Sequence, residues 1–144
     1  MNELTTIVLN AVVAGVAALG FGVLFNVPRR GLFGVALTGV TAALVQVLAL
    51  QLHFTHIAAT FLAAVAVGAI SQLLARRLAM PAYIFSTTGF IPLVPGVAAY
   101  TAVMEFAQHN LNTGLESTVT AISLTLAIGA GLGLVDALMK AKWR

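Results

Sequence analysis

The sequence predicts an all-α integral membrane protein, on the basis of its composition and the length of its uncharged blocks. Of 144 residues, 60% are hydrophobic and 8% are charged, whereas soluble globular domains contain about 25% charged residues. So few charges cannot cover the surface of a domain of this size in water. The uncharged blocks match a hydrocarbon core of about 30 Å, which a helix of about 20 residues crosses.

Five helical spans follow from the positions of the charges and of the polar segments. The block 31–75 carries no formal charge and is too long for one helix, so we divide it at the polar residues 51–56. All five spans belong to a single transmembrane domain over residues 1–144. The predicted spans are 4–26, 31–51, 57–75, 80–104 and 117–138.

The cations give the orientation of these spans. With five spans, every Lys and Arg falls on one face of the membrane, and short cytoplasmic loops are the ones that collect such residues. We therefore predict an outside N-terminus and a cytoplasmic C-terminus. The cations are Arg29, Arg30, Arg76, Arg77, Lys140, Lys142 and Arg144.

The fourth span is predicted to be discontinuous at Pro92 and Pro95. A proline has no N–H and leaves the carbonyl four residues earlier unpaired, here those of Thr88 and Ile91. At 1.5 Å per residue, the break lies about 12 Å from either end of the span, near the bilayer midplane. Irregular backbone at that depth is tolerated only where protein buries it or where it lines a watery cavity. The segment is therefore expected to face inward.

The break predicts a binding site for a carboxylate substrate. A helix that restarts after a proline leaves its first N–H groups unpaired at the positive end of its dipole. Broken helices form the substrate sites of many transporters. The alternative is a proline kink that binds nothing, with Ser and Thr side chains satisfying the backbone. The candidate substrate-binding residues are Ser86, Thr87, Thr88, Gly89, Pro92, Pro95, Gly96, Val97, Ala98 and Tyr100.

Polar residues in the other spans have both a functional and a structural interpretation. Asp136 is a candidate for coupling or for an ion pair, with Arg30 as a candidate partner and Lys140 one turn away. Alternatively, Asp136 is an interfacial acid whose side chain reaches water. Gln46 and Gln72 are expected to form hydrogen bonds between helices rather than to contact substrate.

Two stripes of small residues repeat at every fourth position, one in the first span and one in the fifth. Small residues let helices approach closely in lipid. The stripes serve either packing within this chain or an interface with another subunit. Their members are Ala14, Ala18 and Gly22 in the first span, and Thr125, Gly129, Gly133 and Ala137 in the fifth.

The inventory of reactive residues argues against an enzyme, a metal site and a nucleic-acid partner. The chain has no cysteine, and its one aspartate cannot form the paired aspartates of an intramembrane protease. It contains no P-loop, H-E-x-x-H or G-x-S-x-G motif. His53 and His56 lack a neighbouring carboxylate, which favours an interfacial hinge over a metal site. The scattered cations form no basic face for nucleic acid. We expect no cofactor.

The sequence contains F-N-V-P at 25–28 and a P-x-x-P-G-x-x-x-Y stretch from Pro92 to Tyr100. These two segments resemble the threonine/serine exporter (ThrE) family, and in particular its YjjB-type small membrane subunit. The resemblance implies a two-component exporter in the bacterial inner membrane, acting with a larger YjjP-type subunit. Its substrates would be small carboxylate metabolites, either threonine and serine or succinate-type dicarboxylates. The alternative function is a non-transporting scaffold that stabilises or localises a partner. A homo-oligomer is also compatible with the sequence.

Overall fold

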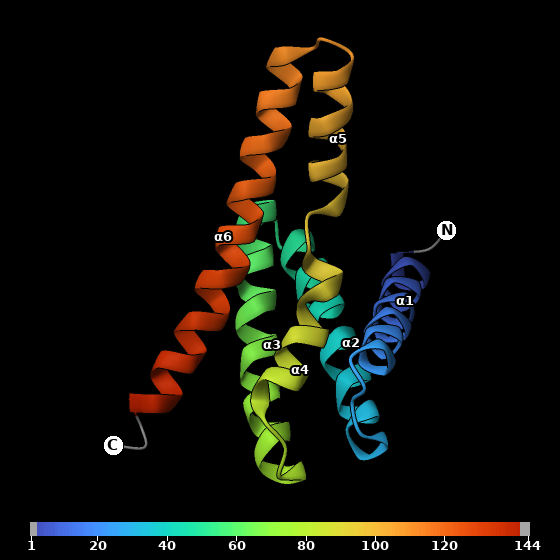
Figure 1. Ribbon diagram of the computed structural model, residues 1–144, viewed down its shortest axis with the longest axis vertical. Helices are drawn as coiled ribbons and strands as arrows, with labels where there is room; N and C mark the ends of the chain where they lie inside the picture. The colour runs from blue at the N-terminus through green and yellow to red at the C-terminus, as the bar shows by residue number, and fades with distance from the viewer. Residues whose placement is uncertain (1–2, 142–144) are drawn as a thin grey trace.

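The computed structural model describes residues 3–141, which form α-helices and one short 3-10 helix, η1 (Figure 1). The described residues contain no strand, and the predicted all-α class is confirmed. In chain order the elements are α1 (Glu3–Leu24), α2 (Arg29–Gln51), α3 (His56–Leu78), α4 (Ala82–Phe90), η1 (Ile91–Leu93), α5 (Gly96–Ala107) and α6 (Leu111–Ala141).

The helices provide four continuous candidate spans and one broken span. α1, α2, α3 and α6 are each long and apolar enough to cross a membrane. The α4–η1 segment and α5 pass the same test as a pair bent by 50°. This confirms the predicted count of about five spans, with the fourth discontinuous at Pro92 and Pro95. α6 begins at Leu111 rather than near residue 117, and its 31 residues correspond to a length of about 46 Å.

Prolines mark the starts of three helices. Pro28, Pro81 and Pro95 directly precede the first residues of α2, α4 and α5. A proline suits this place because the first N–H groups of a helix have no intrahelical partner, so its missing donor costs little. α3 begins differently, since the Oγ1 of Thr55 accepts a hydrogen bond from the N–H of Ala58 at 3.3 Å.

Four helices end on a residue with left-handed backbone, and none of these residues is glycine. They are Asn26, His53, Ala79 and His109, with φ between 50° and 64°. The N–H of the residue after each donates to a carbonyl in the last turn, as in Phe54 to Ala49 at 3.1 Å. This arrangement reverses the chain sharply. His53 therefore lies in the tight turn between α2 and α3, consistent with the hinge expected there.

α2 and α3 form the centre of the molecule. α1 packs on α2, α6 packs on α3, and α4 lies against both α2 and α3 (Figure 1). Gly89 of α4 allows a close approach to both helices, because a Cβ at this position would lie 2.6 Å from the Cβ of Thr38 and 3.0 Å from Val67. One buried cluster consists of Ala42, Ala63, Ala64, Val67, Leu93 and Ile128, and a second of Ala18, Val35, Met80 and Phe85.

The two stripes of small residues have different environments. The stripe of α1 faces α2 within this chain, since a Cβ at Gly39 would lie 2.5 Å from the Cβ of Ala18. The stripe of α6 is exposed, and a Cβ at Gly129 or Gly133 would meet nothing within 4 Å. α6 instead packs on α3 through Gly131 and its neighbours. Packing among residues 3–141 therefore accounts for the first stripe and not for the second.

The described cations gather at one end of the molecule. Figure 1 shows the α1–α2 turn, the α3–α4 turn and the C-terminal end of α6 at the same end, which we call the cation-bearing end. Arg29, Arg30, Arg76, Arg77 and Lys140 belong to these segments, while residues 142 and 144 lie outside the described part. At the other end, α5 and the first half of α6 extend beyond the α2–α3 turn (Figure 1).

Candidate functional site

The interruption between α4 and α5 lies within the depth of the helical bundle. η1 ends at Leu93, which is 4% exposed and packs in the cluster that contains Ala63 and Ala64 of α3. Ala63 is seven residues after His56, or about 10 Å along α3 from its first residue. The broken backbone is therefore inserted between packed helices, and it is neither a continuous helix nor a loop outside the bundle.

The outer side of the interruption is open. Val94 is 50% exposed and Val97 is 82% exposed, and a Cβ at Gly96 would meet nothing within 4 Å. The N–H of Gly96 donates to the carbonyl of Val94 at 2.7 Å. The N–H groups of Val97 and Ala98 belong to the first turn of α5 and have no partner within that helix. Of the predicted carboxylate-binding amides, that of Gly96 is already paired, and those of Val97 and Ala98 lie in a turn whose outer side is exposed.

The other predicted binding residues are spread along α4 and α5 and do not surround one point. Thr88 is 1% exposed, and its hydroxyl donates to the carbonyl of Ile84 at 2.8 Å. Thr87 and Pro92 are half-buried, and Gly89 serves the packing of α4 described above. Tyr100 is 66% exposed on α5. Within residues 3–141 these groups and the α5 amides do not line one common cavity, and their role in substrate binding stays a prediction.

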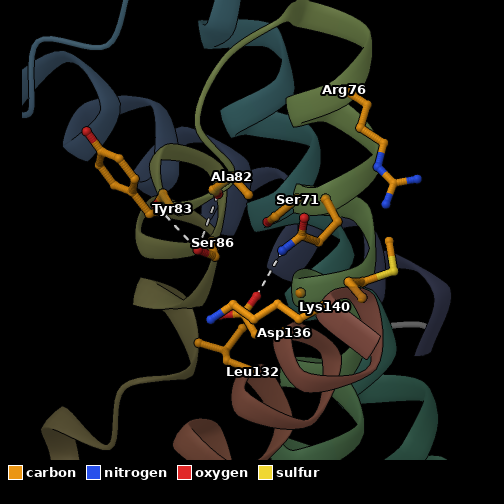
Figure 2. A pocket seen from close by; sticks show the side chains of 11 residues that line it. Ser71, Arg76, Ala82, Tyr83, Ser86, Leu132, Asp136 and Lys140 are labelled. Atoms are coloured by element: carbon orange, nitrogen blue, oxygen red, sulfur yellow. Dashed lines mark hydrogen bonds between the residues drawn. The ribbon is translucent and has the colours of Figure 1, made fainter. Parts of the chain in front are cut away.

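A separate cleft of about 600 Å³ lies between α3, α4 and α6 at the cation-bearing end. Of the predicted residues, it contains Ser86 from α4 and Asp136 from α6 (Figure 2). The amide of Gln72 donates a hydrogen bond of 2.8 Å from its Nε2 to Oδ1 of Asp136. The further polar residues that line the cleft are Ser71, Arg76, Tyr83 and Lys140.

Ser71 has no hydrogen-bond partner although it is buried. Its side chain is 1% exposed, and its Oγ has no partner among the described residues. A serine inside a helix usually returns a hydrogen bond to the preceding turn, as Ser86 does at 3.3 Å to the carbonyl of Ala82. Figure 2 shows Ser71 directed from α3 toward the side of α4. An unpaired buried hydroxyl is costly, so it needs a physical explanation.

The interhelical hydrogen bonds predicted for the two glutamines are confirmed. The Nε2 of Gln46 donates to Oγ1 of Thr60 at 3.1 Å, between α2 and α3, and Gln72 reaches Asp136 as described above. Arg30 does not line the cleft, and it lies in the first turn of α2. Within residues 3–141, no ion pair joins Asp136 to Arg30 or to Lys140. Sequence reasoning missed Ser71, whose only signal was its place beside Gln72 in an apolar span.

The fold and the cleft define a polytopic helical membrane protein with a broken fourth span. Residues 10–138 match the family model described as "Threonine/Serine exporter, ThrE", so the chain belongs to the threonine/serine exporter family. The resemblance to the threonine/serine exporter family is thereby confirmed.

A curated relative supports the same family. The chain is 34% identical over 104 residues to a protein named "Probable threonine/serine exporter" from Mycobacterium tuberculosis (strain ATCC 25618 / H37Rv). The match covers 69% of this chain and 20% of that relative, so the chain spans about one fifth of the relative's length. No solved structure matches the chain.

Proposed function

We propose that this chain is the membrane subunit of a two-component exporter of small carboxylate metabolites. The substrates are threonine and serine or a succinate-type dicarboxylate, and the partner is a larger YjjP-type membrane subunit. The complex acts in the bacterial inner membrane, with the C-terminus of this chain in the cytoplasm. Family membership supports the transport role, and the distribution of the cations supports the orientation.

The observation that carries the proposal is the open interruption between Leu93 and Gly96. Lipid cannot satisfy the backbone groups of irregular chain, so such a segment persists in a membrane only against protein or a watery cavity. In this chain the inner side of the interruption is covered by α3, but Val94 and Val97 on the outer side are exposed. A partner that covers this side would enclose a cavity next to the N–H groups of Val97 and Ala98. These groups would then receive the substrate carboxylate.

The exposed stripe of α6 supports a subunit interface independently. Gly129 and Gly133 have open space beside them and do not serve packing within the described residues. Glycine in the middle of a helix destabilises it relative to alanine. The close packing of another helix against the glycine can offset this cost. A helix of the partner, or of a second copy of this chain, would provide that approach.

Efflux from proteoliposomes tests this function. Vesicles preloaded with labelled threonine or succinate would contain this chain, the larger subunit, or both. The proposal predicts efflux of one of these solutes only when both subunits are present. Equal efflux from the larger subunit alone, with this chain only raising its yield in the membrane, would instead establish the scaffold function. Efflux by this chain alone would contradict the two-component arrangement.

A further inference from the structure

The cleft between α3, α4 and α6 is a polar site that the interruption of the fourth span does not explain. Its volume of about 600 Å³ is within the usual range for small-molecule sites. Building on the exporter function above, we propose that this cleft is a second substrate site, separate from the N–H groups at the start of α5, and that it binds the substrate as a zwitterion. The ammonium group lies against Asp136 and the carboxylate lies toward Lys140, at the cation-bearing end.

The register of α3 and α6 places the polar groups of the cleft in two layers. Both helices run toward the cation-bearing end (Figure 1), and the 2.8 Å hydrogen bond puts Gln72 and Asp136 at the same level. Arg76 and Lys140 follow these two residues by four positions. Because four residues span one helical turn, they lie about 6 Å closer to that end. The backbone of Gln72 and Asp136 therefore lies one helical turn farther from the cation-bearing end than the backbone of Arg76 and Lys140, on the two walls of one cleft.

This layering matches the charges of an α-amino acid. The Gln72 amide uses one oxygen of Asp136, which leaves Oδ2 to accept from an ammonium group. Lys140 forms no ion pair within the described residues and lines the same cleft, so its ammonium is available for a carboxylate. A succinate-type dicarboxylate fits less well, because its second carboxylate would lie beside that of Asp136.

The unpaired hydroxyl of Ser71 is the second observation that points to a ligand. It lines the cleft, is 1% exposed and has no partner within residues 3–141. A bound substrate that places an oxygen beside Ser71 would satisfy this hydroxyl. Ser86 from α4 lines the same cleft (Figure 2), and it supplies a hydroxyl from the opposite wall.

Competition binding to the purified two-subunit complex tests the orientation of the ligand. Labelled L-threonine is the probe, and N-acetyl-L-threonine and succinate are competitors that lack a free ammonium group. We expect both to compete at least about tenfold more weakly than unlabelled threonine, because each leaves Asp136 without its charged partner. In Asp136→Asn, N-acetyl-threonine should compete only about threefold more weakly than threonine, or less. The matched control is Glu116→Gln, which removes one negative charge from the other end of α6. In this variant the difference in competition strength between threonine and N-acetyl-threonine should be the same as in the wild type.

A second readout does not depend on the folding of an Asp136 variant. The chain has no cysteine, so Ser86→Cys introduces a single thiol into the cleft. We expect threonine to slow alkylation of this thiol at least about threefold, as occupancy of a shared cleft requires. The thiol of Asn112→Cys, in the exposed start of α6, should react at the same rate with and without threonine.

The outcomes separate this proposal from the exporter function. Competition by N-acetyl-threonine equal to that by threonine, or no protection of the Ser86→Cys thiol, overturns the cleft as a zwitterion site even if efflux persists. A complex that neither binds nor transports threonine or succinate overturns both proposals. The proposal that the cleft binds the zwitterion is supported by two results together. Threonine protects the Ser86→Cys thiol, and the preference for a free ammonium group is lost in Asp136→Asn but kept in Glu116→Gln.

Discussion

Gln72 and Asp136 join α3 to α6 by a hydrogen bond of 2.8 Å between residues 64 positions apart in the chain. The bond fixes the C-terminal part of α6 against α3, next to the cleft. Interhelical hydrogen bonds of this kind contribute about 0.6 kcal/mol on average in membrane proteins, and up to about 1.7 kcal/mol. The pair therefore adds a polar contact to the α3–α6 packing that positions one wall of the proposed substrate site.

A double-mutant cycle measures the contribution of this pair. Gln72→Ala, Asp136→Ala and the double variant should give a coupling of about 0.5–1.5 kcal/mol in the free energy of unfolding, because either single change removes the same bond. Reversible unfolding in mixed detergent micelles is the measurement. Gln72→Ala combined with Glu116→Ala is the control, and those two effects should be additive. Additive effects in the Gln72 and Asp136 cycle would show that the bond contributes nothing.

Gly89 should tolerate no side chain. A Cβ here would lie 2.6 Å from the Cβ of Thr38, and both groups belong to packed helices that cannot separate freely. We expect Gly89→Ala to destabilise the fold by about 1–3 kcal/mol, as overpacking does. Gly20→Ala is the matched control, since nothing lies within 4 Å of that site, and alanine in its helix should stabilise by about 0.5–1 kcal/mol. Equal midpoints of thermal unfolding for the two variants would contradict the packing described for α4.

Ser71→Ala should raise stability while weakening the proposed binding. The substitution removes a buried hydroxyl that has no partner in the described part of the chain, and such a group costs about 1–3 kcal/mol. Thr88→Val is the comparison, because the hydroxyl of Thr88 is satisfied by the carbonyl of Ile84 and its loss should bring no gain. Unfolding of the purified chain and threonine binding by the complex are both measured. A Ser71→Ala chain that is less stable than the wild type would be inconsistent with an unsatisfied hydroxyl.

The sequence predicted the spans and the broken helix because the responsible signals are local. Charges interrupt the apolar blocks, and a proline removes a specific backbone donor wherever it occurs. Pro92 and Pro95 therefore allow the interruption to be predicted from the sequence alone, without the tertiary structure. The left-handed ends of α1, α2, α3 and α5 gave no such signal, because the residues there are not glycine.

The candidate site was less accessible to sequence reasoning because it depends on distant contacts. Gln72 and Asp136 were each recognised as polar residues in apolar spans, but one sequence does not reveal that α3 and α6 are neighbours. The exposure of Val97 and Tyr100 likewise depends on the direction in which α5 leaves the bundle, and a bend of 50° cannot be read from the prolines. The burial of Ser71 and the lack of a hydrogen-bond partner for its hydroxyl among the described residues can be recognised only in the folded structure.

The orientation in the membrane can be tested with single cysteines, since the chain contains none. Asn112→Cys lies at the end opposite the cations, and Ala141→Cys lies at the cation-bearing end. A membrane-impermeant thiol reagent added to intact cells should modify the first and not the second, because cation-rich segments stay in the cytoplasm. Permeabilised cells, in which both thiols should react, are the control. The reverse pattern in intact cells would exclude the proposed orientation.

The most direct test of the central claim is threonine and succinate efflux by the two-subunit complex carrying Pro95→Ala and Gly96→Leu together. These changes promote a continuous helix and fill the open space beside the first turn of α5. We predict at least about tenfold slower efflux with the complex still assembled, as expected when a charged substrate loses its backbone donors. Gly20→Ala in α1 should leave efflux unchanged. Wild-type efflux by an assembled Pro95→Ala, Gly96→Leu complex would show that the interruption does not carry the solute.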